Sequence, residues 1–134
     1  MDLSTINIFA VVVSALISFV IGGVWYSPIM FANSWMKENG FKEEDMKNAN
    51  MGKIFGTSFL LALVISFNLA AFIGPKGDFA FGLFAGFAAG FGWVAMSIGT
   101  VYLFERKSLK LFFINAGYQI VTYTIMGGIL GVWK

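Results

Sequence analysis

The chain has 134 residues, of which 58% are hydrophobic and only 12% are charged, against roughly 25% charged residues in a typical soluble domain. A soluble protein this small could not hide so much apolar surface, and a net charge of +2 gives no indication of nucleic-acid binding. Cysteine and histidine are absent, which excludes disulfides, thiol catalysis, histidine proton relays and ordinary zinc sites. We therefore expect an integral membrane protein whose partner is the lipid bilayer and which carries no cofactor.

Four stretches without charged residues are long enough to cross a bilayer. A span needs about 20 apolar residues, because a helix rises ~1.5 Å per residue across ~30 Å of hydrocarbon. The first stretch, 3–36, is too long for one straight helix, and Pro28 disfavours helix at Ser27. We expect a single all-α membrane domain over 1–134, a bundle of four transmembrane helices. The spans are predicted at about 6–26, 54–74, 79–104 and 111–132.

The segment 27–53 is predicted to be a cytoplasmic loop that begins with a short interfacial helix at Ile29–Lys37. Phe31 and Trp35 lie four residues apart and would share the apolar face of that helix. A second short helix, mostly polar, is expected within 41–50. Aromatic residues at a membrane edge commonly anchor a helix there. The predicted interfacial anchors are Trp25, Tyr26, Pro28 and Trp35.

The positive charges are unevenly divided between the two ends of these spans. Seven of the nine Lys and Arg side chains lie in the segments 27–53 and 105–110, and the other two are Lys76 and Lys134. Cytoplasmic loops carry an excess of Lys and Arg. The sequence therefore predicts a multi-pass cell-membrane protein with both long loops in the cytoplasm and both termini outside.

Small residues recur every four positions in all four predicted spans. Examples are Ala10, Ser14, Ser18 and Gly22 in the first span, and Gly82, Gly86 and Gly90 in the third. In lipid, helices associate where small side chains let their backbones approach. The stripes predict glycine-rich packing within a compact four-helix bundle, in a homo-oligomer, or in both, and a homo-oligomer is expected.

Short motifs in both halves of the chain resemble those of the family called domain of unknown function 1761. The first is Gly-Gly-Val-Trp-Tyr-Ser-Pro at 22–28, followed by Phe31 and Trp35. The second half adds Leu-Phe at 103–104, Lys-Ser-Leu-Lys-Leu at 107–111, Asn-Ala-Gly-Tyr at 115–118 and Gly-Gly at 127–128. The resemblance covers nearly the whole chain and implies four spans. It implies no activity, so no catalytic or binding residue is carried over from it.

No charged residue lies within any predicted span, which argues against a proton-coupled pump, since such proteins need ionisable groups in the membrane. A conventional catalytic triad is impossible without histidine, and no phosphate-binding loop or metal motif occurs. We therefore expect no enzyme, no catalytic residue and no metal site.

The polar side chains that remain within the predicted spans are uncharged. The candidate polar layer comprises Ser18, Asn68, Trp93, Ser97, Asn115, Tyr118, Gln119 and Thr122.

This polar layer is open to more than one interpretation. Asn115, Tyr118, Gln119 and Thr122 share one helix face, and Gln119 is expected to point into the bundle because an unpaired amide in hydrocarbon costs several kcal/mol. The layer would form either helix-to-helix hydrogen bonds or the lining of a cavity. The two functional hypotheses are a channel or facilitator for a small solute or ion, and a non-transporting accessory subunit that docks an unidentified protein partner through its cytoplasmic loops.

Overall fold

The computed structural model describes residues 3–134, and it is helical without strands over that range. The long helices are α1 (Ile8–Trp25), α4 (Met51–Ile73), α5 (Phe79–Ala89) and α7 (Leu109–Val132). A π-helical segment, Gly90–Ala95, joins α5 to α6 (Met96–Glu105) without a break. The shorter elements are a 3-10 turn (Leu3–Thr5), α2 (Ala32–Asn39) and α3 (Glu43–Lys47). The predicted all-α class is confirmed.

Three helices are long and apolar enough to cross a membrane: Ile8–Trp25, Met51–Ile73 and the continuous helix Phe79–Glu105. The fourth expected span, α7, has the length but is not as apolar, because Asn115, Tyr118, Gln119 and Thr122 interrupt it. Nine α7 residues are buried, more than in any other helix of the described chain. A helix surrounded by protein tolerates polar side chains that a lipid-facing helix cannot.

Each long helix begins at a polar side chain that accepts hydrogen bonds from its first backbone N–H groups. Asn7 caps α1, Asn50 caps α4, Asp78 caps α5 and Ser108 caps α7. The interfacial helix predicted at Ile29–Lys37 begins three residues later, at Ala32. The chain turns first through 27–31, where the Ser27 hydroxyl donates to the Val24 carbonyl.

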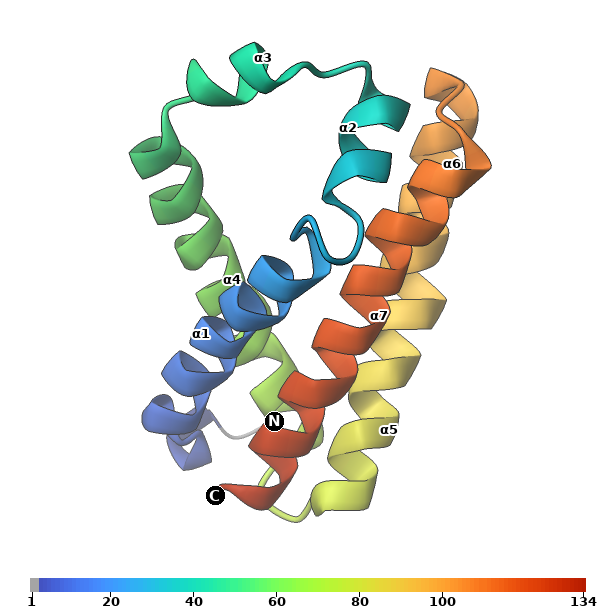
Figure 1. Ribbon diagram of the computed structural model, residues 1–134. Coiled ribbons are helices and arrows are strands. Elements are labelled where there is room, and N and C mark those ends of the chain that lie inside the picture. The colour runs from blue at the N-terminus through green and yellow to red at the C-terminus, as the bar shows by residue number, and fades with distance from the viewer. Residues whose placement is uncertain (1–2) are drawn as a thin grey trace.

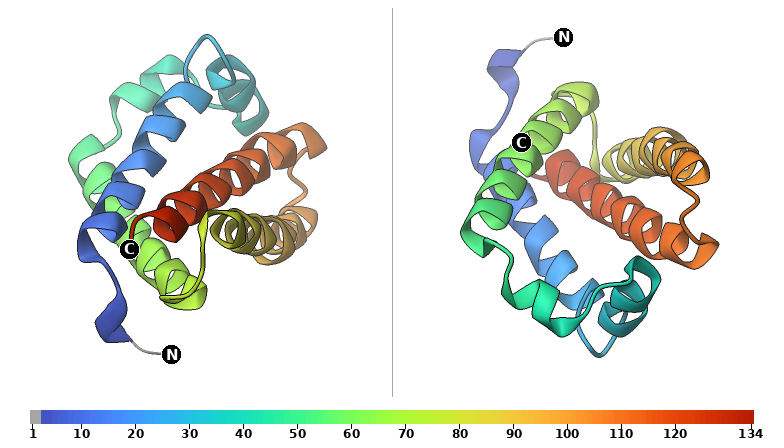
Figure 2. Two further views of the ribbon diagram at one scale, coloured as in Figure 1. Left: turned by 90° about the horizontal axis from the view of Figure 1, so that it is seen from below. Right: turned by 90° about the horizontal axis from the view of Figure 1, so that it is seen from above.

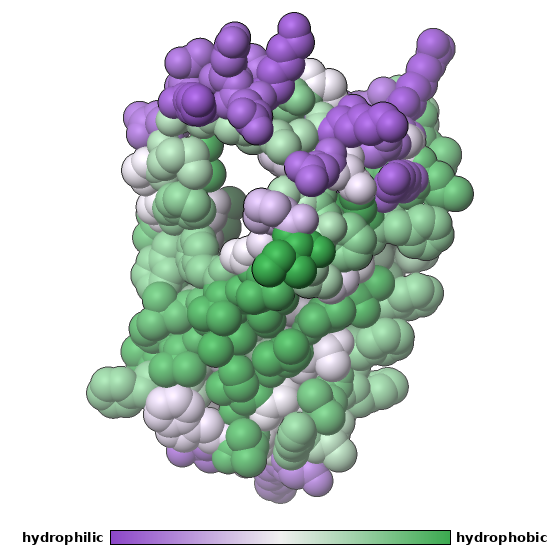
Figure 3. Space-filling view, in the orientation of Figure 1, coloured by the Kyte–Doolittle hydropathy of each residue, from purple (hydrophilic) through white to green (hydrophobic). Residues whose placement is uncertain are grey.

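The helix α7 occupies the middle of the bundle, with α5 along one side and α1 and α4 along the other (Figures 1 and 2). Both chain ends lie at one end of the bundle, and α2, α3 and the α6–α7 hairpin lie at the other (Figure 1). From their crossing, α1 and α4 diverge toward the α2–α3 end. Figure 3 shows a hydrophobic band between two hydrophilic ends, and an opening between α4 and the α2–α3 segment.

The seam between α5 and α7 brings two backbones into direct contact. A Cβ atom added at Gly82 would overlap the Gly127 carbonyl oxygen, and one added at Gly86 would overlap the Tyr123 carbonyl oxygen. At Gly131 it would overlap the carbonyl oxygen of Asp78. Only glycine fits at such distances, so the small-residue stripes of these two helices face each other within one chain.

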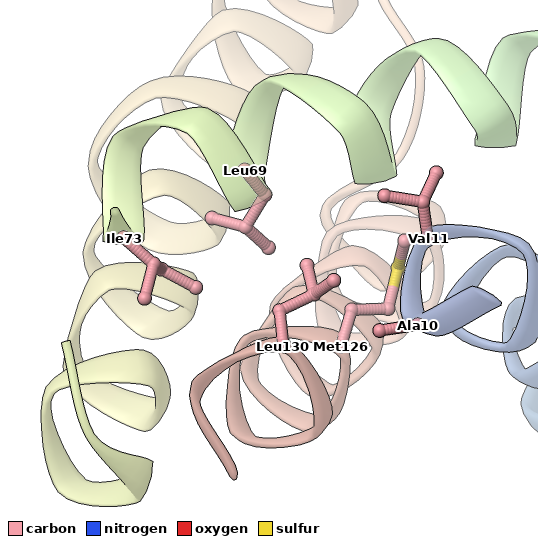
Figure 4. Close-up of a cluster of buried hydrophobic side chains, with 6 residues drawn as sticks. All are labelled: Ala10, Val11, Leu69, Ile73, Met126 and Leu130. Atoms are coloured by element: carbon pink, nitrogen blue, oxygen red, sulfur yellow. The ribbon is translucent and has the colours of Figure 1, made fainter. Parts of the chain in front are cut away.

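The other side of α7 packs through larger side chains. Ala10 and Val11 of α1, Leu69 and Ile73 of α4, and Met126 and Leu130 of α7 form a buried cluster near the chain ends (Figure 4). Beside this cluster the Ser66 hydroxyl of α4 donates to the Val11 carbonyl of α1 at 2.9 Å. The cluster and this bond fix the crossing point of α1, α4 and α7.

Candidate solute-binding cavity

Two of the sequence motifs, Gly-Gly-Val-Trp-Tyr-Ser-Pro at 22–28 and Asn-Ala-Gly-Tyr at 115–118, meet in space through bonds between residues 89 positions apart. The Trp25 indole N–H donates to the Ile114 carbonyl at 2.8 Å, and the Tyr26 hydroxyl donates to Asn115 Oδ1 at 2.6 Å. Asn115 in turn donates from Nδ2 to the Tyr102 hydroxyl oxygen at 2.7 Å. One hydrogen-bonded chain therefore links the end of α1 to α7 and α6.

Two glycines make room for these aromatic rings. A Cβ added at Gly117 would lie 3.0 Å from the Trp25 ring, and one at Gly22 would lie 3.2 Å from the Tyr118 hydroxyl. Trp25 and Tyr26 are half-buried against α7. Both were predicted as interfacial anchors. In the structure their polar atoms bond to the neighbouring helix, so they join helices in addition to any contact with lipid.

The other two predicted anchors lie farther out. Pro28 is exposed in the turn after α1. The Trp35 ring packs against the rings of Tyr26 and Phe41, with ring centroids 6.0 and 5.3 Å apart. Trp35 thereby holds α2 to the end of α1.

A cavity of about 240 Å³ lies where α1, α4 and α7 diverge. Four residues of the predicted polar layer line it: Ser18, Tyr118, Gln119 and Thr122. The other lining residues are Phe19, Ser58, Leu61, Ala62, Ile65, Tyr123 and Met126. None of them is charged. The chemistry available inside is neutral hydrogen bonding beside apolar walls.

Some of this hydrogen-bonding capacity is unused. Thr122 is only 3% exposed, and its hydroxyl forms no hydrogen bond within residues 3–134. Its polar neighbour on the same helix, the Tyr118 hydroxyl, donates its proton to the Ser18 carbonyl at 2.8 Å. The half-buried Gln119 amide likewise forms no hydrogen bond with the described chain. The Thr122 oxygen is closed off from the cavity, so the Gln119 amide is the group that favours an occupant able to supply donors and acceptors.

One helical turn of apolar side chains separates this cavity from the end that carries the chain termini. Met126 lines the cavity and belongs to the buried cluster of Figure 4. Leu130, four residues on, lines a small hollow of about 20 Å³ beyond that cluster. There the Lys134 ammonium group donates to the Gly74 carbonyl at 2.6 Å. A turn of helix advances about 5.4 Å, so the apolar barrier is thin.

The structure places the remaining members of the predicted layer elsewhere. Asn115 belongs to the Tyr26–Asn115–Tyr102 chain described above. Asn68, Trp93 and Ser97 are exposed and do not line the cavity. Asn68 lies two residues after the buried Ser66, and Ser97 two residues after the buried Ala95. Two residues rotate a helix by about 200°, which turns both side chains to the outer face.

Sequence reasoning missed two contributors. Ser58 lines the cavity and belongs to the small-residue stripe of its span, a pattern that indicates packing rather than a site. Tyr102 accepts the Asn115 bond, and nothing in its sequence neighbourhood singles it out. No group of three or more acidic, histidine or cysteine side chains that could hold a metal ion occurs in 3–134.

Comparison with known proteins identifies one family. The family model described as "Protein of unknown function (DUF1761)" matches residues 9–131, which include both motifs and every cavity-lining residue. No curated protein matches the chain, and no solved structure matches it.

Proposed function

The chain belongs to this family of proteins of unknown function, and from that premise we propose that it is a four-span membrane protein that passes a small neutral solute. The solute would enter the cavity between α1, α4 and α7 and hydrogen-bond to the Gln119 amide. The observation that carries this proposal is the cavity itself: about 240 Å³, lined without charge, with the Gln119 amide on its wall and not hydrogen-bonded within the described residues.

The position of α7 in the bundle supports the proposal of four spans. The three apolar helices surround it, and it has 24 residues, enough for the ~20 that a bilayer requires. The chain termini lie together at the end opposite to α2–α3 and the α6–α7 hairpin (Figure 1), as an even number of crossings requires. The polar residues of α7 would be shielded from lipid by the neighbouring helices.

The orientation in this proposal places the α2–α3 end in the cytoplasm and both termini outside, following the excess of Lys and Arg at that end. The chain has no cysteine, so single cysteines can be introduced without background. Glu44→Cys and Lys76→Cys alter exposed positions at opposite ends. In intact cells, an impermeant thiol reagent should label Lys76→Cys and leave Glu44→Cys unlabelled; the reverse pattern would reject the orientation.

A facilitator also needs a path past the cavity. The barrier is the apolar turn from Met126 to Leu130, with the small hollow beyond it. We propose that this turn is the gate, because apolar constrictions block polar solutes by excluding water. The gate needs only small side-chain movements, since the unbranched Met126 adopts many rotamers.

Solute flux into liposomes tests this function. Purified protein is reconstituted, and the swelling of the vesicles is followed after dilution into isotonic glycerol or urea. We expect flux above protein-free vesicles, faster flux for Met126→Ala, and slower flux for Gln119→Leu. Ser97→Ala, an exposed polar change on α6, serves as the control. No flux of either solute by the wild-type protein and by Met126→Ala would reject a facilitator for solutes of this class.

The accessory-subunit hypothesis rests on a different feature. Every α3 residue except Met46 is exposed, and a hollow of about 340 Å³ lined by Tyr26, Trp35, Met36 and Met46 lies beside it. Such a surface could receive a protein partner on the cytoplasmic side. A defined partner that co-purifies in fixed ratio and is lost on Met46→Glu would favour this function, whereas flux by the isolated protein would favour the first. We propose no enzymatic activity for this chain. A homo-oligomer also stays a prediction, to be tested by native mass spectrometry.

A further inference from the structure

Another hollow lies at the α6–α7 hairpin, away from the solute cavity. It measures about 470 Å³ and is lined mainly by apolar side chains, among them Met96, Leu103 and Phe112. Lys107 and Ser108 lie at its hairpin end. The hollow is thus amphipathic along its length, apolar between the helices and basic at the tip.

The packing of the long helix Phe79–Glu105 explains why the hollow forms. Along α5 its glycines touch the α7 backbone, but the π-helical segment Gly90–Ala95 carries an extra residue per turn and rotates the face that follows. Beyond it, no α6 residue is buried, and α6 contacts α7 far less than α5 does. The two helices therefore separate toward the hairpin and leave space between them.

A second hollow lies on the other flank of the first turn of α7. It measures about 460 Å³ and is lined by Phe31, Ser34, Phe113 and Ile114, with Lys110 at its edge. Leu109 lines both hollows. Each hollow is therefore an apolar groove with one lysine at its edge, and the two grooves meet at the tip of the hairpin.

The charges at this tip are unbalanced. Arg106, Lys107 and Lys110 stand against the single acid Glu105, and none of the four forms an ion pair within residues 3–134. The hydrophobic surface beside them is highly exposed: Leu103 is 80% and Phe104 86% exposed. Basic groups next to apolar surface at a membrane edge attract anionic lipid headgroups.

We propose that the α6–α7 hairpin binds one anionic diacyl phospholipid. Its phosphate lies between Lys107 and Lys110, and its two acyl chains lie one in each hollow, on either side of Leu109. Two grooves that meet at one basic tip match the two chains and single phosphate of such a lipid. A single-chain lipid would fill only one groove, and a zwitterionic lipid would gain less from the lysines.

Native mass spectrometry of delipidated protein in a nonionic detergent tests the proposal. The protein is titrated with dioleoylphosphatidylglycerol, its single-chain lyso form, and dioleoylphosphatidylcholine. We expect one phosphatidylglycerol per chain, bound more tightly than either of the other two lipids. Each lysine near a membrane surface contributes about 1 kcal/mol, so Lys107→Gln with Lys110→Gln should weaken binding of phosphatidylglycerol roughly 30-fold.

A matched control removes the same charge elsewhere at this end of the bundle. Lys47→Gln with Lys53→Gln alters two exposed lysines outside both hollows and should leave the affinity unchanged. Gly99→Leu and Met96→Trp each fill the larger hollow and should weaken binding while both lysines remain; two variants guard against one that fails to fold. Equal affinity for phosphatidylglycerol and phosphatidylcholine, or for the lyso form, would overturn the proposal. So would unchanged binding by the lysine pair or by a folded filling variant.

Discussion

On one side of α7 the glycines of two helices touch backbone to backbone, whereas on the other side serine, threonine and glutamine border a cavity. Helices on both sides carry stripes of small residues repeated every four positions. Glycine removes the space between helices, and the α5–α7 seam closes completely. Serine keeps a hydroxyl and lets α1 and α4 diverge from α7, which leaves polar groups facing a hollow. The comparison teaches that a small-residue stripe brings two backbones into contact where its members are glycine, and leaves room beside the helix where they are serine.

The largest effect should come from breaking the closed side. Gly82→Leu places a side chain where the Gly127 carbonyl lies, so α5 and α7 must separate along their length. We expect a loss of more than about 3 kcal/mol, or failure to assemble. The control is Gly56→Leu on α4, where a Cβ meets no atom within 4 Å. Thermal melting in detergent compares them; equal midpoints would show that the seam is not close-packed.

The next effect concerns the contact between the two motifs. Tyr26→Phe removes the donor to Asn115 Oδ1 and leaves that half-buried oxygen with one fewer partner. The expected cost is about 1–3 kcal/mol, measured as a lower melting temperature. Tyr123→Phe is the matched control, because the Tyr123 hydroxyl forms no hydrogen bond within 3–134. If both variants melt alike, the Tyr26 bond contributes nothing to stability.

A smaller loss is expected at the crossing of α1 and α4. Ser66→Ala deletes a fully buried hydroxyl that donates to the Val11 carbonyl across the two helices. Interhelical bonds of this kind contribute around 0.6 to 2 kcal/mol in membrane proteins. Ser97→Ala, on an exposed face, should melt like the wild type. A wild-type melting temperature for Ser66→Ala would place the whole stability of this crossing in its apolar contacts.

The smallest effect, with the opposite sign, belongs to Ser14. Its hydroxyl is fully buried on α1, lines none of the cavities described above, and has no hydrogen-bond partner in the described residues. Ser14→Ala removes that unpaired group, so the melting temperature should stay level or rise by the equivalent of at most ~1 kcal/mol. A clear fall would reveal a bound water or another partner at Ser14.

Much of the fold could be predicted from the sequence. Charge-free runs bracket the long helices closely; the expected span at 79–104, for example, matches the continuous helix Phe79–Glu105. The π-helical segment was not predicted, because no residue between Gly90 and Ala95 forces an extra residue into the turn. The apolarity of α7 was overestimated, since a run without charges can still contain several neutral polar residues.

The candidate site was less predictable. Helical spacing placed Tyr118, Gln119 and Thr122 on one face of α7, and the structure puts that face on the cavity wall. Ser97 was included in the candidate polar layer because it is a polar residue within a span, but its position along the span does not determine which way its side chain points. The role of Trp25 and Tyr26 was also hidden, because an aromatic pair beside a proline is typical of an anchor. Only the fold shows that the acceptors of their hydrogen bonds, on Ile114 and Asn115, lie opposite them.

The central place of α7 has a consequence for how this protein is made. A ribosome delivers α1 first and α7 last, so the indole of Trp25 and the hydroxyl of Tyr26 emerge long before their acceptors on α7 exist. Until then, the earlier helices lack the partner against which each of them packs. In the proposed four-span arrangement, α7 is less apolar than the other three spans and would leave the translocon most readily against them. Truncation before residue 109 would therefore strand an unfinished bundle with its polar groups facing lipid, a natural target for membrane quality control.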